Sequence, residues 1–317
     1  RSSIYVEGLL NSFAIAAVTT LMVFVISLPL ATVYDRFEFP GKKLTSLFIM
    51  LPLILPPFVG ALGFQHILGN YGVFNTVLSG LGLSPVDWLG GHGRFWSVCL
   101  IEALHLYPIL YLNLITSLAN IDPAMDEAGR NLGAGRWCRF RKITLPLVKP
   151  GILAGGSIVL IWSFTELGTP LMFGYNRVTT VQIFNGITEL ETNPLPYSLV
   201  LVMLAIAGGL YMLSKFAFGG SSAGTVTKGM SGSSAVSLAG WKKYLPFALI
   251  LGITCCATLP HVALILTAFS KDWYGTILPH AYSLMHFENA LSDEIVVPSI
   301  LNSLKYSGLA MIFALVA

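Results

Sequence analysis

The sequence predicts an all-α, polytopic membrane protein, and composition, hydropathy and the length of its apolar runs each support this class. Hydrophobic residues fill 55% of the 317 positions. Charged residues fill 10%, and soluble domains carry about 25%. The mean hydropathy is +0.74. Apolar runs of roughly 20 residues, enough to cross a hydrocarbon core about 30 Å thick, recur along the chain. They are too long and alternate too little for barrel strands, so we expect helices.

Seven membrane spans are expected, and the loops between them differ in charge. Thirteen of the 18 Lys and Arg residues fall in alternate loops, on one side of the membrane. The positive-inside rule places these loops in the cytoplasm. Residue 1 is then outside, and we expect an earlier span before it. The spans are residues 9–33, 44–68, 95–118, 150–175, 195–218, 243–269 and 298–317.

A stretch rich in small residues divides the chain. Residues 219–240 are mainly Gly, Ser, Ala and Thr, a composition typical of flexible linkers. A short repeat lies on either side of it, since Leu10-Asn11-Ser12 opens the first span and Leu301-Asn302-Ser303 opens the last. We therefore predict a first transmembrane domain that lacks its first helix, a cytoplasmic linker, and the truncated start of a second, similar domain: residues 1–218, 219–241 and 242–317.

The cytoplasmic loop between the third and fourth spans has the pattern of a short surface helix. Asp122 is a good N-cap, and Pro123 suits the first helical position. Asp126 and Arg130 are four residues apart and can pair on one face. Gly133 should end the helix, after which a basic stretch returns the chain to the membrane. A short helix held between two spans is suited to transmit a push.

This loop resembles the coupling motif in permease subunits of binding-protein-dependent ABC importers. That motif reads Glu-Ala-Ala, three residues, Gly, nine residues, Ile, any residue, Leu-Pro. The sequence has Glu127-Ala128-Gly129, then Gly133, then Ile143-Thr144-Leu145-Pro146, with both spacings intact. Gly129 departs from the motif and weakens the helix by about 1 kcal/mol. An ordinary basic turn would explain the charges but not the spacing. The expected coupling residues are Asp126, Glu127, Ala128, Gly129, Gly133, Ile143, Leu145 and Pro146.

The resemblance implies type I ABC importer architecture in the bacterial inner membrane, together with partners and a mechanism. The loop would form a coupling helix in a groove of a cytoplasmic ABC ATPase dimer, whose closure on ATP rocks the spans from inward-open to outward-open. A periplasmic binding protein would deliver the substrate. The chain has no Gly-rich Lys-Ser/Thr phosphate loop, so we expect a transport subunit and not an enzyme. No cofactor, resident metal site or nucleic acid is expected, and the bilayer is the remaining partner.

Polar side chains within the spans are costly and become candidates for lining the pathway. Glu102 and His105 lie one turn apart in the third span, but they could equally pair and pack between helices. Their spacing resembles that of metal ligands, although two ligands from one helix do not make a site. Glu166 could line a gate or cap a helix. The candidates are Glu102, His105, Glu166 and Gln65.

The cargo is suggested by resemblance to one group within the family. Two fused domains, with Ser-Phe-Thr-Glu-Leu-Gly-Thr-Pro at residues 163–170, resemble the ferric-iron importers most. Related groups carry aminoethylphosphonate, thiamine, polyamines, sulfate or molybdate. A secondary transporter driven by an ion gradient is the alternative of another class. A membrane-embedded enzyme would need clustered groups such as H-E-x-x-H, which are missing from the sequence.

Outer-loop residues that could receive the binding protein are Gln182, Glu189, Glu191, Asn193, Asp272, Asp293 and Glu294.

Overall fold

A computed structural model describes residues 2–54, 56–187, 194–218 and 236–316, and within these ranges the chain is almost wholly helical. The strands are a two-residue parallel pair. In chain order the elements are α1 (Ser2–Arg36), β1 (Phe37–Glu38), α2 (Lys42–Ile54), α3 (Pro57–Leu68), α4 (Val73–Gly80), α5 (Gly91–Ala119), α6 (Pro123–Asn131), α7 (Arg136–Arg139), a π turn (Phe140–Thr144), α8 (Leu145–Thr165), α9 (Gly168–Met172), α10 (Thr179–Ile187), α11 (Leu195–Phe218), β2 (Val236–Ser237), a 3-10 turn (Gly240–Tyr244), α12 (Leu245–Phe269), α13 (Met285–Ser292) and α14 (Val296–Val316).

Long apolar helices confirm the all-α membrane class. Six segments of the described chain are long and apolar enough to cross a bilayer, and a seventh span results if the bent pair of α2 with α3 and α4 is one span. The bend in that pair is 92°. Proline accounts for the break, because Pro56 precedes α3 and Pro57 occupies its first turn. The expected second span, residues 44–68, is therefore two helices.

The expected fourth span, residues 150–175, is also interrupted and is not one continuous helix. α8 ends at Thr165, and Glu166 has an extended backbone with ψ at 130°. The five-residue helix α9 follows as a separate element. The Glu166 side chain accepts hydrogen bonds from the first backbone N–H groups of α9, so the break is stabilised locally.

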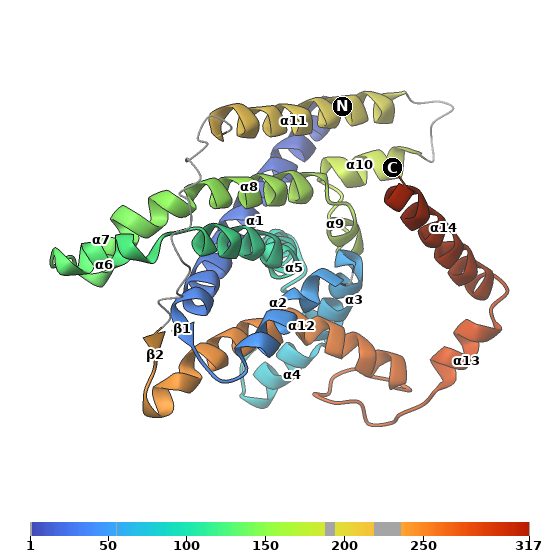
Figure 1. Ribbon diagram of the computed structural model, residues 1–317. Helices are drawn as coiled ribbons and strands as arrows, with labels where there is room; N and C mark the ends of the chain where they lie inside the picture. The colour runs from blue at the N-terminus through green and yellow to red at the C-terminus, as the bar shows by residue number, and fades with distance from the viewer. Residues whose placement is uncertain (1, 55, 188–193, 219–235, 317) are drawn as a thin grey trace.

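The core lies where α1, α5 and α8 pack together (Figure 1). Tyr107 of α5 is fully buried; its hydroxyl donates to the carbonyl of Ile49 in α2 at 3.1 Å. Ser27 of α1 donates to the carbonyl of Tyr107 at 2.8 Å. Small residues let α8 approach α5, because a Cβ on Gly151 would lie 2.1 Å from Ser117 Oγ. Close approach at small residues is the usual packing of membrane helices.

The chain after residue 235 packs onto the part before residue 218. β2 pairs with β1, and α12 packs along α2 and α3 (Figure 1). The α3–α12 crossing is tight, since a Cβ on Gly63 would lie 1.9 Å from the carbonyl oxygen of Pro260. The ring of His66 stacks on that of Trp273, with centroids 5.9 Å apart. α12 therefore joins the first helical group, whereas α14 is almost entirely exposed.

Candidate functional site

The loop between α5 and α8, which is predicted to be cytoplasmic, folds as its sequence predicts. Asp122 is the N-cap of α6, and its Oδ1 accepts from the backbone N–H of Ala124 at 2.9 Å. Pro123 takes the first helical position. α6 ends at Asn131, and Gly133 follows with φ at +76°, a left-handed conformation that favours glycine. After this turn, α7 leads through the π turn into the first residues of α8.

An ion pair joins α6 to α7. Arg139 Nε lies 3.0 Å from Asp126 Oδ1, and the Arg139 residue is 8% exposed. Arg139 also donates to the carbonyl of Ala134 at 3.3 Å. The predicted partner Arg130 lies 3.9 Å from Asp126, and its side chain is 62% exposed. The Asp126–Arg130 pair therefore exists but is the weaker of the two. Helix spacing could not have found Arg139, because it approaches across a glycine turn.

Gly129, the one departure from the coupling motif, is buried against other parts of the loop. A Cβ at this position would lie 2.9 Å from Ile143 Cδ1 and 3.2 Å from Arg139 Cδ. These distances are shorter than ordinary van der Waals contact, so even alanine would require its neighbours to shift. Glycine here lets α6 lie closer to α7 and the π turn. The motif residue Ile143 is thus part of the packing that holds α6.

The opposite side of the loop is exposed and partly apolar. Leu132 is 87% exposed, Trp137 is 71% exposed and Met125 is 43% exposed. Trp137 stacks on Phe140 at a centroid distance of 5.6 Å. Of the other expected coupling residues, Glu127, Ala128, Gly133 and Pro146 are exposed and Leu145 is half-buried. The loop therefore offers both polar and apolar surface on the cytoplasmic side.

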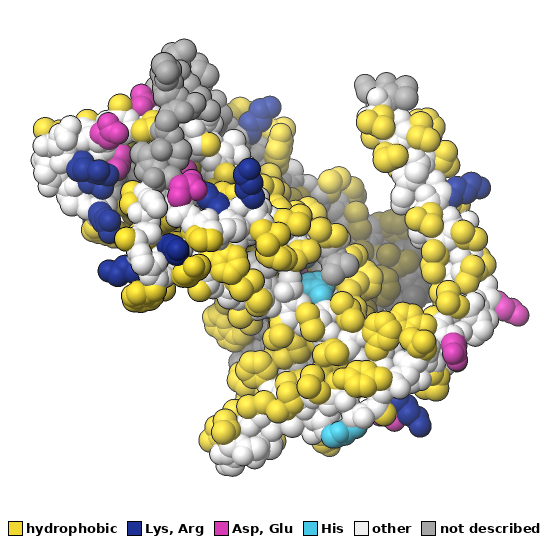
Figure 2. Space-filling model, turned by 60° about the horizontal axis from the view of Figure 1, so that its bottom comes forward, with side chains coloured by type: hydrophobic (Ala, Val, Ile, Leu, Met, Phe, Trp, Pro, Cys, Tyr) yellow, Lys and Arg dark blue, Asp and Glu magenta, His cyan; other side chains and the backbone are white. Residues whose placement is uncertain are grey.

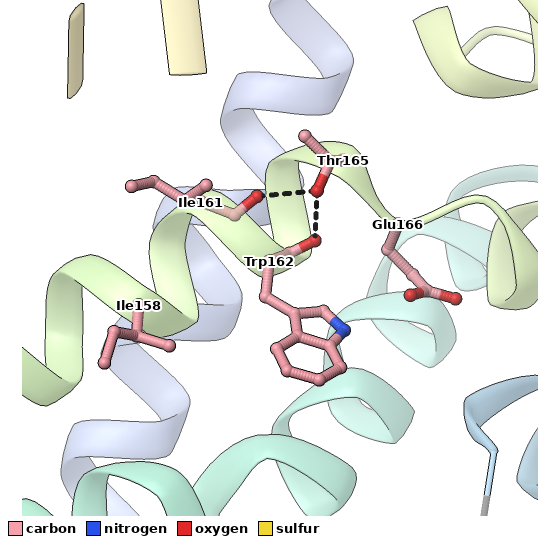
Figure 3. Close-up of a pocket in the computed structure, with 5 residues that line it drawn as sticks. All are labelled: Ile158, Ile161, Trp162, Thr165 and Glu166. Carbon is pink, nitrogen blue, oxygen red and sulfur yellow. Dashed lines mark hydrogen bonds between the residues drawn. The ribbon is translucent and has the colours of Figure 1, made fainter. Parts of the chain in front are cut away.

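A pocket of about 400 Å³ opens at the outer end of α8, and Glu166 lines it together with Ile158, Ile161, Trp162 and Thr165. Figure 3 shows the indole nitrogen of Trp162 turned toward the Glu166 side chain. Thr165 donates to the carbonyls of Ile161 and Trp162, so its hydroxyl is committed to the helix. The lining is mostly apolar and carries one carboxylate.

Glu166 is half-buried and combines its place in the pocket with a structural role. Its Oε1 accepts from the N–H of Gly168 at 2.9 Å and of Thr169 at 3.4 Å. Its backbone carbonyl accepts from Thr180 Oγ1 at 2.8 Å. The structure therefore confirms that this residue caps a helix, and its place on the transport pathway stays a prediction.

Glu102 and His105 lie in the helix interface and not in this pocket. Glu102 is 1% exposed, and its Oε2 accepts hydrogen bonds from Thr19 of α1 and Ser163 of α8. Its Oε1 has no partner among the described residues. The two residues do not pair with each other, because His105 lies against Pro52 of α2. Sequence spacing suggested their common face but not their different neighbours.

The remaining candidates hold the outer side of the molecule together. Gln65 donates to the carbonyl of Met172 in α9 at 2.6 Å. Gln182 donates to the carbonyl of Ile4, and Arg177 pairs with Glu7 at 3.0 Å. In the part of the chain that the structure describes, no group of three or more His, Cys, Asp or Glu could hold a metal ion. Asp272, Asp293 and Glu294 are exposed, and Glu189, Glu191 and Asn193 lie outside the described residues.

Comparison with known proteins now identifies the family. A family model described as the binding-protein-dependent transport system inner membrane component matches residues 29–219. This match covers more than half of the chain, including the α6–α7 loop and the pocket. The chain belongs to this family. It is a permease component of an ABC importer and a multi-pass inner-membrane protein, as the loop motif and the apolar spans predicted.

Relatives of this permease differ in their named cargo. A probable molybdenum ABC transporter permease of Haloferax volcanii is 31% identical over 200 residues, 62% of this chain and 70% of the relative. A putative ferric transport system permease of Haemophilus influenzae is 28% identical over 313 residues, 96% of this chain. The chain spans 48% of the length of that ferric relative. The named cargo of these relatives therefore leaves the substrate open.

Solved structures share the fold at low identity. A bacterial ABC transporter that imports the acidic polysaccharide alginate superposes with a TM-score of 0.56 and 18% identity, over 72% of this chain and 82% of that one. A methionine ABC transporter in an inward-facing conformation gives a TM-score of 0.51 at 18% identity, over 68% of this chain and 95% of that one. Both similarities support type I permease architecture.

Proposed function

We propose that this permease moves ferric iron from a periplasmic binding protein to the cytoplasm by alternating access, driven by a separate ABC ATPase. The observation that supports ferric iron as the cargo is the length of chain over which ferric permeases match. Ferric permeases of Haemophilus influenzae and Actinobacillus pleuropneumoniae match 313 and 310 residues, 96% of the chain in each case. Molybdenum permeases match 165 to 200 residues.

The same extent supports a two-domain organisation. The ferric matches include residues on both sides of the small-residue stretch 219–241, so one relative chain carries both parts. We propose that residues 1–218 are a first permease domain and residues 242–317 the start of a second. α12 and α14 would then be the first helices of that second domain.

The charge of the pocket favours a cation over an oxyanion. Its lining contains the Glu166 carboxylate and no Lys or Arg. Hard cations are bound through carboxylate oxygens, whereas oxyanions are bound by Arg, Lys and backbone N–H groups. In the chain as a whole, Lys and Arg are concentrated in the predicted cytoplasmic loops. An ionised Glu166 would therefore attract a ferric cargo and repel molybdate.

Molybdate is the second candidate, because the molybdenum permeases have slightly higher identities, 30 to 31%. The two can be separated by uptake into proteoliposomes that hold the full-length permease, its ATPase and its binding protein. We expect ATP-dependent uptake of radiolabelled ferric iron, unaffected by excess molybdate or aminoethylphosphonate. Uptake of labelled molybdate in place of iron would overturn the ferric assignment while leaving the permease class intact.

Coupling through the α6 loop is proposed from its geometry and tested by a bulky substitution. Glu127→Trp would place a large ring on the exposed face of α6 and should separate ATP hydrolysis from uptake or release the ATPase from the membrane. Gly156→Ala is the control, because nothing lies within 4 Å of its added Cβ. Normal ATPase binding and uptake in the Glu127 variant would contradict the coupling role. Uptake that survives loss of the ATPase but collapses with the proton gradient would favour a secondary transporter.

A further inference from the structure

The helix α4 and the loop after it turn an apolar face outward. Phe74, Val77 and Leu81 are spaced three and four residues apart, so they lie on one side of the helix. They are 47%, 41% and 71% exposed. The following loop continues this surface with Leu83 at 55% and Val86 at 42% exposed. In a membrane protein, an exposed apolar face on a short helix between two spans meets either lipid or another protein.

The inward side of α4 carries a buried polar residue and its outward side is apolar. A helix that faces water has the opposite arrangement. Asn75 is 2% exposed. Its side-chain nitrogen donates to the carbonyls of Gly69 and Val86 at 3.1 and 3.0 Å. Its oxygen accepts from the N–H of Val86 at 2.9 Å and from the indole of Trp88 at 3.3 Å. Asn75 thereby fixes the orientation of α4 and keeps the apolar face outward.

The position and charge of this segment point to lipid as the occupant. Residues 67–86 contain no charged side chain, whereas a water-facing surface typically carries charges of both signs. The segment connects α3 to α5 on the predicted outer side, and the carbonyl of Tyr71 accepts from the N–H of Gly275 in the outer loop after α12. Phe74 also contacts Trp88 edge to face, an aromatic pairing typical of membrane interfaces.

α4 packs beside α12, which also carries exposed apolar residues. Val73 at the start of α4 packs with Ala263 of α12 and with Trp273. On the other side of the same part of α12, Leu259, Val262 and Phe269 are exposed. Figure 2 shows this face, at the bottom of Figure 1, as mostly hydrophobic, with Lys and Arg concentrated at the α6–α7 end.

We infer that α4 is an interfacial helix whose Phe74–Val77–Leu81 face inserts into the outer leaflet of the bilayer. Helices of this kind lie in the membrane plane and bury their apolar side at the boundary between headgroups and acyl chains. Through Asn75, which bonds to the backbone at Gly69 and Val86, α4 would then hold the end of α3 and the loop before α5 at a fixed depth beside α12.

The test measures where this face lies in the reconstituted full-length permease. Phe74→Cys, Val77→Cys and Leu81→Cys, made one at a time after replacement of the native cysteines, carry a nitroxide label in phosphatidylcholine vesicles. We expect collisions with oxygen to exceed collisions with the water-soluble chelate nickel ethylenediaminediacetate at all three sites. Asp87→Cys is the matched control on the same loop and should show the opposite ratio.

Three other results would overturn the inference, and each identifies a different occupant. Strong collision with the nickel chelate at residues 74, 77 and 81 means that the face meets water. Protection from both reagents in the permease alone means that another part of the protein covers it. Nickel accessibility that is lost on adding the binding protein means that the face is a receptor site. ATP-dependent uptake is measured on each labelled variant, and a variant that has lost uptake is treated as misfolded.

Discussion

The two ends of α8 are held to the rest of the permease by different chemistry. At the cytoplasmic end, the Asp126–Arg139 ion pair and the close packing of Gly129 join α6 to the turn that leads into α8. At the outer end, Ser163 donates to Glu102, which also receives a hydrogen bond from Thr19 of α1. One end uses opposite charges, and the other uses hydroxyl groups on a buried carboxyl group.

The difference follows from the solvent at each end. Water reaches the cytoplasmic loop, so desolvation of an ion pair there is partial and an arginine can be held at modest cost. In the bilayer a second full charge is expensive, and hydroxyl donors satisfy a carboxyl group without it. α8 thus connects the α6–α7 loop, for which a coupling role is proposed, with a turn whose residues Trp162, Thr165 and Glu166 line the pocket.

The largest expected effect comes from filling the space at Gly129. Gly129→Leu would force α6 away from Ile143 and Arg139, and overpacking of this kind costs about 3 kcal/mol. We expect a lower thermal unfolding midpoint in detergent and loss of ATP-driven uptake. Gly135→Leu in the same loop is the control, since nothing lies within 4 Å of its Cβ. Equal behaviour of the two variants would mean that packing at Gly129 does not hold α6.

The next effect concerns the ion pair. Asp126→Ala leaves the nearly buried Arg139 guanidinium without its carboxylate, which should cost about 2 kcal/mol. Asp126 is itself about a third exposed, so water limits the loss. Arg130→Ala should cost less than about 0.5 kcal/mol, because that pair is longer and exposed. Urea unfolding or thermal midpoints of the two variants measure the difference, and a larger effect of Arg130 would reverse the assignment.

Sequence alone predicted the features that depend on local chemistry. The N-cap at Asp122, the end of α6 before Gly133 and the apolar spans follow from residue preferences that act over a few positions. The motif spacing from Glu127 to Pro146 indicated the family, which the family match confirmed. The roles of the individual coupling residues stay predictions.

Sequence could not predict the contacts that depend on how distant helices meet. Arg139 reaches Asp126 across a glycine turn, and Ser163 meets Glu102 from another helix. The end of α8 at Thr165 was not predicted, because the apolar run continues past it, although the sequence did suggest that Glu166 could cap a helix. Periodicity gives the face of a helix but not its neighbour.

A smaller effect is expected at the outer end of α8. Glu102→Leu removes the acceptor of Thr19 and Ser163 but also removes a buried polar group, and the two changes partly offset each other. We expect a net loss of about 1 kcal/mol, the worth of one typical hydrogen bond. Glu102→Gln keeps an acceptor oxygen and should lose less. Thermal midpoints of both variants check this, and greater damage from Gln than from Leu would show that the acceptor oxygen does not stabilise this interface.

The smallest effect on stability, yet a large one on transport, is expected at Glu166. Glu166→Gln retains an oxygen that can accept from Gly168 and Thr169, so the cap on α9 survives and stability should change by less than about 0.5 kcal/mol. Glu166→Ala removes the cap and should cost about 1 kcal/mol.

If the carboxylate attracts a cationic cargo, Glu166→Gln lowers ferric uptake while ATP hydrolysis and the thermal midpoint stay near those of the unmodified permease. Unchanged uptake in this variant would reduce Glu166 to a helix cap. Thr165→Val is the matched control, because Thr165 lines the same pocket but its hydroxyl is bound to α8 carbonyls. A loss shared by both variants would indicate pocket shape, whereas a loss confined to Glu166→Gln would indicate charge.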